Sequence, residues 1–264
     1  MSKVTDAANA VAAVATAVPI YQDLFQPAVR ELGKGVHTLS KTVHIALSPV
    51  SALVWGYDQI KNYVQTTVEK KLQNVPQENI IVPDPIVVGP AVEALRYTAH
   101  KEELREMFAN LIATAMDKEK ALKAHPSYVE IIKQLSPDEA RMLSSIKGNG
   151  LLPIIDLRAG KPNGEIGFFE IKKHFTDLAY VAGCSNPELG SAYIENLNRL
   201  GLIFIDKETY LIDHEMYYDE LINHSEIKSL FPMITSMSRT IDFRKYSFTR
   251  TEFGENFVNA CIRY

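Results

Sequence analysis

The chain has 264 residues, of which 46% are hydrophobic, and its 13 glycines and 13 prolines are too few for a disordered or fibrous protein. A formal net charge of -4 at pH 7 gives no overall attraction to nucleic acid or to anionic lipid. The two cysteines, Cys184 and Cys261, show no paired spacing, which argues against a disulfide scaffold and a zinc site. We therefore expect a folded cytoplasmic protein.

Residues 1–79 are predicted to form a helical region with few charges. Residues 7–22 contain no Asp, Glu, Lys, Arg or His, and residues 42–57 contain only His44 among these types. Each stretch is shorter than the roughly 20 apolar residues that cross a bilayer, and each contains a proline. Lys3 is offset by Asp6, so the flank does not fit an export signal.

The small and aromatic residues of this region fit two interpretations. A helix that is hydrophobic on all sides is usually buried, either in a core or in an oligomer contact. The same residues also fit an interfacial helix, which would place the protein at the periphery of the inner membrane. The candidate membrane or oligomer contacts are Val11, Val14, Val18, Leu53, Trp55 and Tyr57.

Residues 80–135 are predicted to be a connector followed by a helical block. The prolines of Pro83 to Pro90 predict an extended connector. In residues 102–116, apolar side chains at spacings of three and four predict a helix whose Asn110 faces water. The pattern S-x-x-E at Ser127 and again at Ser136 predicts two capping boxes.

Residues 136–264 show mixed helix and strand patterns. We expect helices at 137–147, 171–182 and 185–200, a strand at 154–157, and a ribbon of two strands at 202–206 and 209–213. A last helix would begin with a capping box of Thr249 and Glu252. Three helices followed by a ribbon are typical of a winged helix, so the predicted class is mainly α, α+β overall, with a winged-helix-like C-terminal domain.

Several segments of the chain match a known sequence pattern in order. They are GP-x-x-EALRY at Gly89 to Tyr97, EELREMFANLIATAM at Glu102 to Met116, HPSYVEIIKQLSPDEA at His125 to Ala140 and G-x-x-F-x-x-ACI at Gly254 to Ile262. With these segments the chain resembles the abortive-infection alpha family of bacterial proteins, and the likeness extends to Leu47–Tyr57 and Tyr193–Ile203. The resemblance implies a role in phage defence, in which an infected cell stops growing or dies before the phage matures. It supplies no active site.

Common catalytic motifs do not occur in the sequence. There is no phosphate-binding loop, no dinucleotide-binding glycine pattern, no H-E-x-x-H and no G-x-S-x-G. The acidic and histidine-bearing segment from His214 to His224 has ligand-like spacing, but we interpret it as a solvated helix face. We therefore expect no enzyme activity, no catalytic residue, no metal and no cofactor.

Nucleic-acid binding is a weaker interpretation. The expected recognition helix carries Glu188 and Glu195 against one base, Arg199, so it would repel the phosphate backbone. The candidate nucleic-acid contacts are Asn196, Arg199, Arg244 and Lys245.

Three hypotheses for the function follow. The first is a non-enzymatic antiphage protein that acts through contacts with a protein partner, a phage component or another copy of itself, or at the membrane. The second is a winged-helix DNA-binding regulator. The third is an unrecognised hydrolase, for which the clustered carboxylates of metal chemistry are missing.

Overall fold

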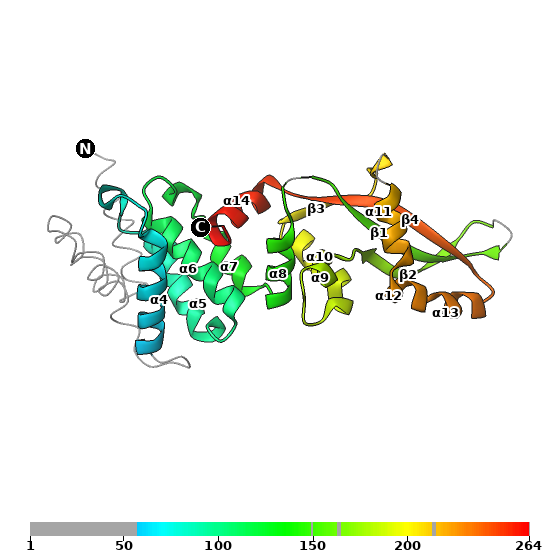
Figure 1. The fold of residues 1–264 in the computed structure, drawn as a ribbon, viewed down its shortest axis with the longest axis horizontal. Helices are drawn as coiled ribbons and strands as arrows, with labels where there is room; N and C mark the ends of the chain where they lie inside the picture. Colours follow the sequence, from blue (N-terminus) through cyan, green and yellow to red (C-terminus); the bar gives the residue numbers. More distant parts are fainter. Residues whose placement is uncertain (1–56, 149, 163–164, 213–214, 264) are drawn as a thin grey trace, which may run out of the picture. The chain divides into compact units, whose positions relative to one another are not determined.

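The structure is a computed structural model that describes residues 57–148, 150–162, 165–212 and 215–263 (Figure 1). The chain divides into two compact units: unit 1 ends at Leu135 and also includes residues from Asn259 on, and unit 2 is Ser136–Val258. Helices and one four-stranded antiparallel sheet confirm the predicted α+β class. The candidates Val11, Val14, Val18, Leu53 and Trp55 lie outside the described residues, and Tyr57 begins the first described helix.

Unit 1 is built from helices that bury apolar side chains against α6. None of the helices in the described residues is long and apolar enough to cross a membrane. The elements of unit 1 are α4 (Tyr57–Leu72), η1 (Gln77–Asn79), α5 (Pro85–Thr98), α6 (Glu102–Met116), η2 (Ala121–Lys123), α7 (Ser127–Lys133) and the last residues of α14 (Glu252–Cys261).

The predicted extended connector is wrong beyond Asp84, because α5 begins at Pro85 and contains Pro90. The Asp84 carboxylate accepts a hydrogen bond from the backbone N–H of Ile86 at 2.9 Å, and Pro85 occupies the first turn, where a missing N–H costs little. Pro90 costs about 3 kcal/mol inside a helix, but each fully buried valine or leucine returns about 1.5–3 kcal/mol. The helix is therefore held by its buried residues, which are Val87, Val88, Ala91, Val92, Ala94 and Leu95.

The prediction that Asn110 faces water is also wrong. Asn110 is buried, and its Nδ2 donates to the carbonyl of Cys261 at 2.8 Å and to that of Ile262 at 3.3 Å. One turn further along α6, the Thr114 hydroxyl donates to the carbonyl of Ala260 at 2.9 Å. The last carbonyls of a helix have no partner within the helix, so these side chains complete the C-terminal end of α14.

Unit 2 is built around a sheet with the strand order β2–β1–β4–β3, all neighbours antiparallel. Its strands are β1 (Leu152–Gly160), β2 (Phe168–Phe175), β3 (Ile203–Asp206) and β4 (Thr240–Arg250). Its helices are α8 (Pro137–Ser145), α9 (Leu178–Val181), η4 (Pro187–Leu189), α10 (Gly190–Arg199), α11 (Glu215–Asn223), α12 (Ser225–Ser229) and α13 (Phe231–Ser236), followed by α14.

The two faces of β1 have different neighbours. Ile155, Leu157 and Ala159 alternate along one face and form a buried core with Tyr218 and other residues of α11, α12 and α13. Asp156 lies between them and therefore points to the opposite face. The side chains of Tyr246 from β4 and His174 from the end of β2 lie beside it there.

Two local predictions in unit 2 are corrected. Residues 171–182 do not form one helix, because 168–175 pair with β1 as β2 and only 178–181 are α-helical. The predicted strand at 209–213 is wrong, because residues 209–212 are not in a strand and β3 pairs instead with β4. In both places, pairing between strands determines the secondary structure and overrides the local spacing of apolar residues.

Two of the three predicted capping boxes are wrong as well. The box of Ser136 and Glu139 is present at α8, but Ser127 is the first residue of α7 rather than its cap. At α14 the hydroxyl of Thr251 accepts from the N–H of Gly254 at 2.8 Å. Gly254 must remain glycine, because a Cβ there would lie 2.0 Å from the carbonyl oxygen of Leu202.

We predict that Thr114→Val lowers the free energy of unfolding by about 1–2 kcal/mol, because it leaves the buried carbonyl of Ala260 without its donor. The control is Thr98→Val, since the Thr98 hydroxyl only donates to Ala94 within its own helix. Urea unfolding, followed by circular dichroism, measures the free energy of unfolding of both variants. Equal midpoints for the two variants would contradict the role of Thr114.

Candidate functional site

A bulge in the pairing of β1 with β2 is the first feature of the candidate site. Ile155 pairs with Phe175 and Leu157 pairs with Lys172, so Asp156 alone lies opposite both Lys173 and His174. His174 has a φ of 51°, in the left-handed region that few residues other than glycine adopt. Bulges and strained backbone of this kind occur often next to functional sites, and this position has both features.

Asp156 is a buried carboxylate with two donors. It is 1% exposed, and its Oδ1 accepts from the backbone N–H of His174 at 2.9 Å and from the hydroxyl of Tyr246 at 2.5 Å. Burial, and then the hydrogen bond to Asp156, raise the pKa of Tyr246 well above its usual value of 10. The phenol therefore stays protonated and donates at every physiological pH. The Asp156 carboxylate joins β1 to the bulge of β2 and to β4.

The imidazole of His174 has an unusual environment. Its side chain is 12% exposed, and its Nδ1 lies 3.3 Å from Oε1 of Glu195 on α10. Both ring nitrogens are buried without a hydrogen-bond partner among the residues that the structure describes. Burial lowers the pKa of His174 below 6.5, against the opposing effect of the Asp156 and Glu195 carboxylates. At pH 7 the ring is therefore neutral, and its contact with Glu195 is not an ion pair.

We refer to Asp156, His174, Glu195 and Tyr246 as the polar cluster. A neutral imidazole whose neighbours are two carboxylates can take up a proton when the pH falls. Within the described residues, no group of three or more His, Cys, Asp or Glu side chains could hold a metal ion. The cluster as it stands can accept a proton and fix α10 against the sheet.

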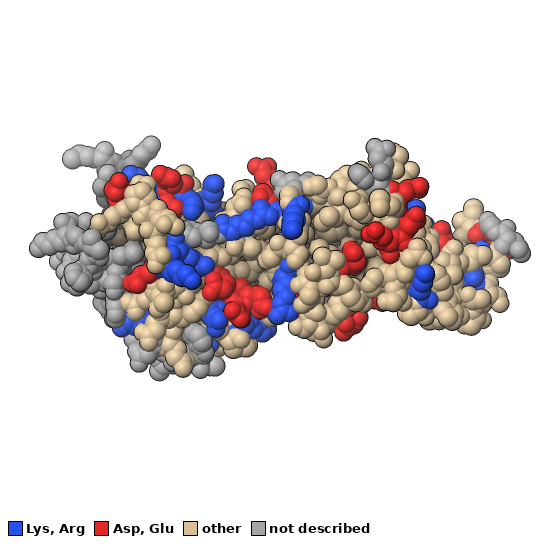
Figure 2. Space-filling view, in the orientation of Figure 1, with Lys and Arg blue, Asp and Glu red and all other residues tan. Residues whose placement is uncertain are grey.

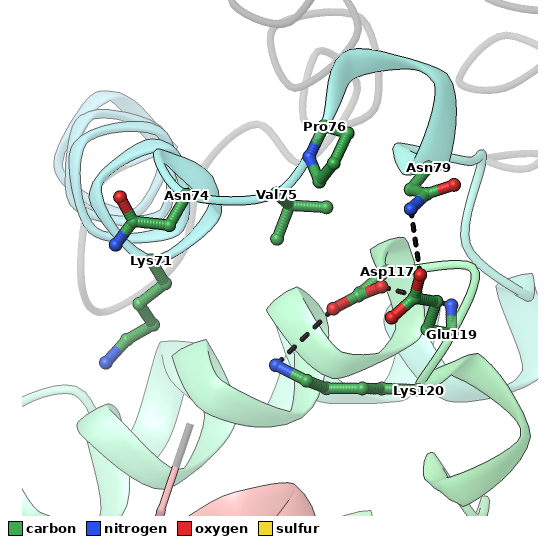
Figure 3. Close-up of a pocket in the computed structure, with 8 residues that line it drawn as sticks. All are labelled: Lys71, Asn74, Val75, Pro76, Asn79, Asp117, Glu119 and Lys120. Atoms are coloured by element: carbon green, nitrogen blue, oxygen red, sulfur yellow. Dashed lines mark hydrogen bonds and ion pairs between the residues drawn. The ribbon is translucent and has the colours of Figure 1, made fainter.

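Unit 1 contains a second candidate, a cavity of about 310 Å³ between the end of α4 and the turn after α6 (Figure 3). The buried carboxylate of Asp117 lies 3.4 Å from Nζ of Lys120, and Nδ2 of Asn79 donates to Glu119 at 3.1 Å, as the dashed lines in Figure 3 show. Lys71, also on the lining, pairs with Glu106 at 3.1 Å. The charged side chains that line this cavity are therefore already paired with other side chains of unit 1. The His174 ring nitrogens have no hydrogen-bond partner among the described residues, so the polar cluster is the stronger candidate site.

The predicted nucleic-acid contacts are engaged within unit 2. Nδ2 of Asn196 donates to Glu139 at 2.7 Å, and its Oδ1 accepts from the guanidinium of Arg199 at 2.7 Å. On β4, Arg244 donates to the carbonyl of Lys207 at 3.2 Å, and Nζ of Lys245 lies 3.6 Å from Glu215. The structure therefore separates these candidates into two places, one on α10 and one on β4.

The polar cluster could not be recognised in the sequence, because its members lie on three separate strands and on α10. The only local signal is Asp156, a charge inside the apolar run from Ile154 to Leu157. An aspartate inside a predicted buried strand needs hydrogen-bond donors from elsewhere in the fold, so this residue could have been predicted as part of a polar site. Neither His174 nor Tyr246 carries a comparable signal.

We predict a pH-dependent stability that originates at His174. Above pH 6.5 the ring is neutral in both states, but as the pH falls below 6.5 the unfolded chain takes up a proton that the folded chain does not. The free energy of unfolding should then fall by up to about 1.4 kcal/mol per pH unit, until the pH reaches the lowered pKa of the folded state.

His174→Asn should reduce this slope, because asparagine tolerates the positive φ and does not titrate. The matched control is His100→Asn at an exposed histidine. Urea unfolding at several values between pH 5 and pH 8 measures the slopes. If His174→Asn and wild type have the same slope, the cluster does not respond to protons in this range.

Comparison with known proteins gives one family. The family model described as abortive infection alpha matches residues 56–261. A solved structure of an uncharacterized protein from the hydrocarbon-degrading marine bacterium Alcanivorax borkumensis SK2 is similar over 54% of this chain and 94% of that chain, with 14% identity and a TM-score of 0.35. No curated protein matches. Since the family model covers most of the chain, the protein belongs to the abortive infection alpha family.

Proposed function

We propose that the protein acts in bacterial antiphage defence of the abortive-infection type, through contacts with other proteins and without a chemical step of its own. The observation that carries the defence role is the family match over residues 56–261. The segments at 102–116 and 254–262, which carry the resemblance to the family, contain residues that hold the fold together, such as Thr114 and Gly254. These structural roles support a function without catalysis.

We also infer that unit 2 is an elaborated winged helix. The order α8, α9, α10, β3, β4 gives three helices followed by two paired antiparallel strands. Two additions extend this pattern: β1 and β2 are placed between the first two helices, and residues 207–239, with α11 to α13, are placed between β3 and β4. This arrangement favours the DNA-binding regulator as the second candidate function.

The side chains of α10 favour a function in protein contacts rather than in the recognition of DNA bases. Besides Asn196, Asn198 is engaged, since its Oδ1 accepts from the backbone N–H of Ile205 at 3.2 Å. Glu195 lies against His174 of β2. A recognition helix needs free polar side chains for base edges and cations for phosphates, and α10 offers few of either. On the face drawn in Figure 2, basic and acidic side chains are interspersed rather than separated into a basic surface.

The defence role predicts fewer phage from cells that express the protein. Cultures should collapse or stop growing at high phage load and survive at low load, while plaque counts fall. Gly254→Ala is the control for a misfolded chain, because its new methyl group would overlap the Leu202 carbonyl. Equal plaque counts with and without the wild-type gene over a broad phage panel would remove the proposal.

The regulator alternative predicts a different result. We expect gel-shift titrations of duplex DNA at moderate salt to show no sequence-selective complex, and Arg199→Ala to change nothing, because Arg199 is bonded to Asn196. The control is Arg244→Ala on β4. A defined operator that binds in the nanomolar range and is lost with Arg199→Ala would establish the regulator instead.

A further inference from the structure

Helix α11 presents a fixed outer face to solvent. Its inward face is anchored, because Tyr218 and Leu221 are fully buried in the core below the sheet. The hydroxyl of Tyr218 donates to the carbonyl of Tyr246 at 2.8 Å and accepts from the N–H of Leu211 at 3.1 Å. These bonds hold the helix and the residues before it to β4, so the outer face is a preformed surface.

Large apolar side chains lie exposed on and beside this helix. Met216 is 61% exposed and Tyr217 is 42% exposed, and Ile212, which precedes the helix, is 73% exposed. Single exposed apolar residues are ordinary on protein surfaces, but neighbouring ones mark interaction sites. Methionine and tyrosine are also the residue types that protein interfaces favour.

The charges of the same face are acidic. Asp219 and Glu220 follow Met216 by three and four residues, so they share its face of the helix, and both are exposed. Glu215 lies 3.6 Å from Lys245, but neither Asp219 nor Glu220 forms an ion pair among the described residues. Figure 2 shows acidic side chains gathered over the position of α11, with few basic ones beside them.

We propose that Ile212, Met216, Tyr217, Asp219 and Glu220, the α11 surface, bind a basic segment of a partner protein. Lysine or arginine side chains of that segment would lie against Asp219 and Glu220, and its apolar side chains against Met216 and Tyr217. Charge complementarity selects this occupant, because the carboxylates of Asp219 and Glu220, which form no ion pair with the residues that the structure describes, repel nucleic acid, anionic lipid and acidic proteins. The inference rests on the proposed function, since it names the surface through which the protein contacts are made.

The first experiment uses the purified full chain and a labelled amphipathic peptide built of leucine and lysine. Fluorescence anisotropy should show binding that weakens as salt is raised, and a peptide of leucine and glutamate should not bind. The double change Asp219→Lys and Glu220→Lys should weaken binding of the lysine peptide by about tenfold or more. The matched control, Glu78→Lys with Glu93→Lys, makes the same change of charge at exposed acids of unit 1 and should bind as wild type does.

Circular dichroism should show the same melting for both double variants and wild type, so that a loss of binding is not a loss of fold. Equal binding by the Asp219 and Glu220 variant, equal binding of the glutamate peptide, or no binding by wild type would overturn the proposal. Sedimentation that reveals self-association through these residues would overturn it too, by replacing the partner with a second copy.

Phage plating separates this inference from the proposed function. If wild type and the unit 1 control protect cells and the Asp219 and Glu220 variant does not, the α11 surface is the route of defence. If all three protect, the α11 surface is not that route, while the defence role stands. If wild type itself does not protect, the defence role fails, and the peptide measurements still decide whether the surface binds basic segments.

Discussion

The hydrogen bonds from α6 to the end of α14 are the contact on which the rest of unit 1 depends. Asn110 and Thr114 donate to the carbonyls of Cys261, Ile262 and Ala260, which a helix end cannot satisfy by itself. The partners are 146 to 152 residues apart in sequence. A buried carbonyl without a donor costs about 1–3 kcal/mol, a large share of the stability of a small domain. This contact joins two segments that are distant in sequence, 102–116 and 254–262, in one structural element.

Local sequence patterns predicted the elements that depend on neighbouring residues alone. They failed for the elements whose structure depends on a segment distant in sequence. The helix at 102–116, the capping box at Ser136 and the strand around Ile154 could be predicted, because apolar spacing and cap chemistry are local properties. Strand β2 could not, because its apolar residues also fit helical spacing and only pairing with β1 resolves the choice. The local pattern places Asn110 on the solvent-facing side of α6, because its partner at the end of α14 is distant in sequence.

The polar cluster and the α11 surface illustrate the same limit for function. Asp156, His174 and Tyr246 come from three strands, and no spacing in the sequence relates them. The α11 residues, in contrast, are neighbours in sequence, and their acidic character was visible from the start. What the sequence lacked was the inward anchor of Tyr218, which turns a helix of mixed composition into a surface with a defined outer face. The side chains of Asp156 and His174 are enclosed within unit 2, whereas those of the α11 surface are exposed to solvent.

The membership of α14 in both units has a consequence for biosynthesis. The helix begins in unit 2 and ends in unit 1, so Ala260 and Cys261 supply contacts for α6, which is translated well before them. A chain emerging from the ribosome can form α4 to α7, but the donors on α6 must wait for Ala260 and Cys261 to be translated. Until then the apolar surface of unit 1 is exposed to aggregation and to proteases. A nonsense or frameshift mutation just before Ala260 should therefore leave α4 to α7 translated but unit 1 without these contacts.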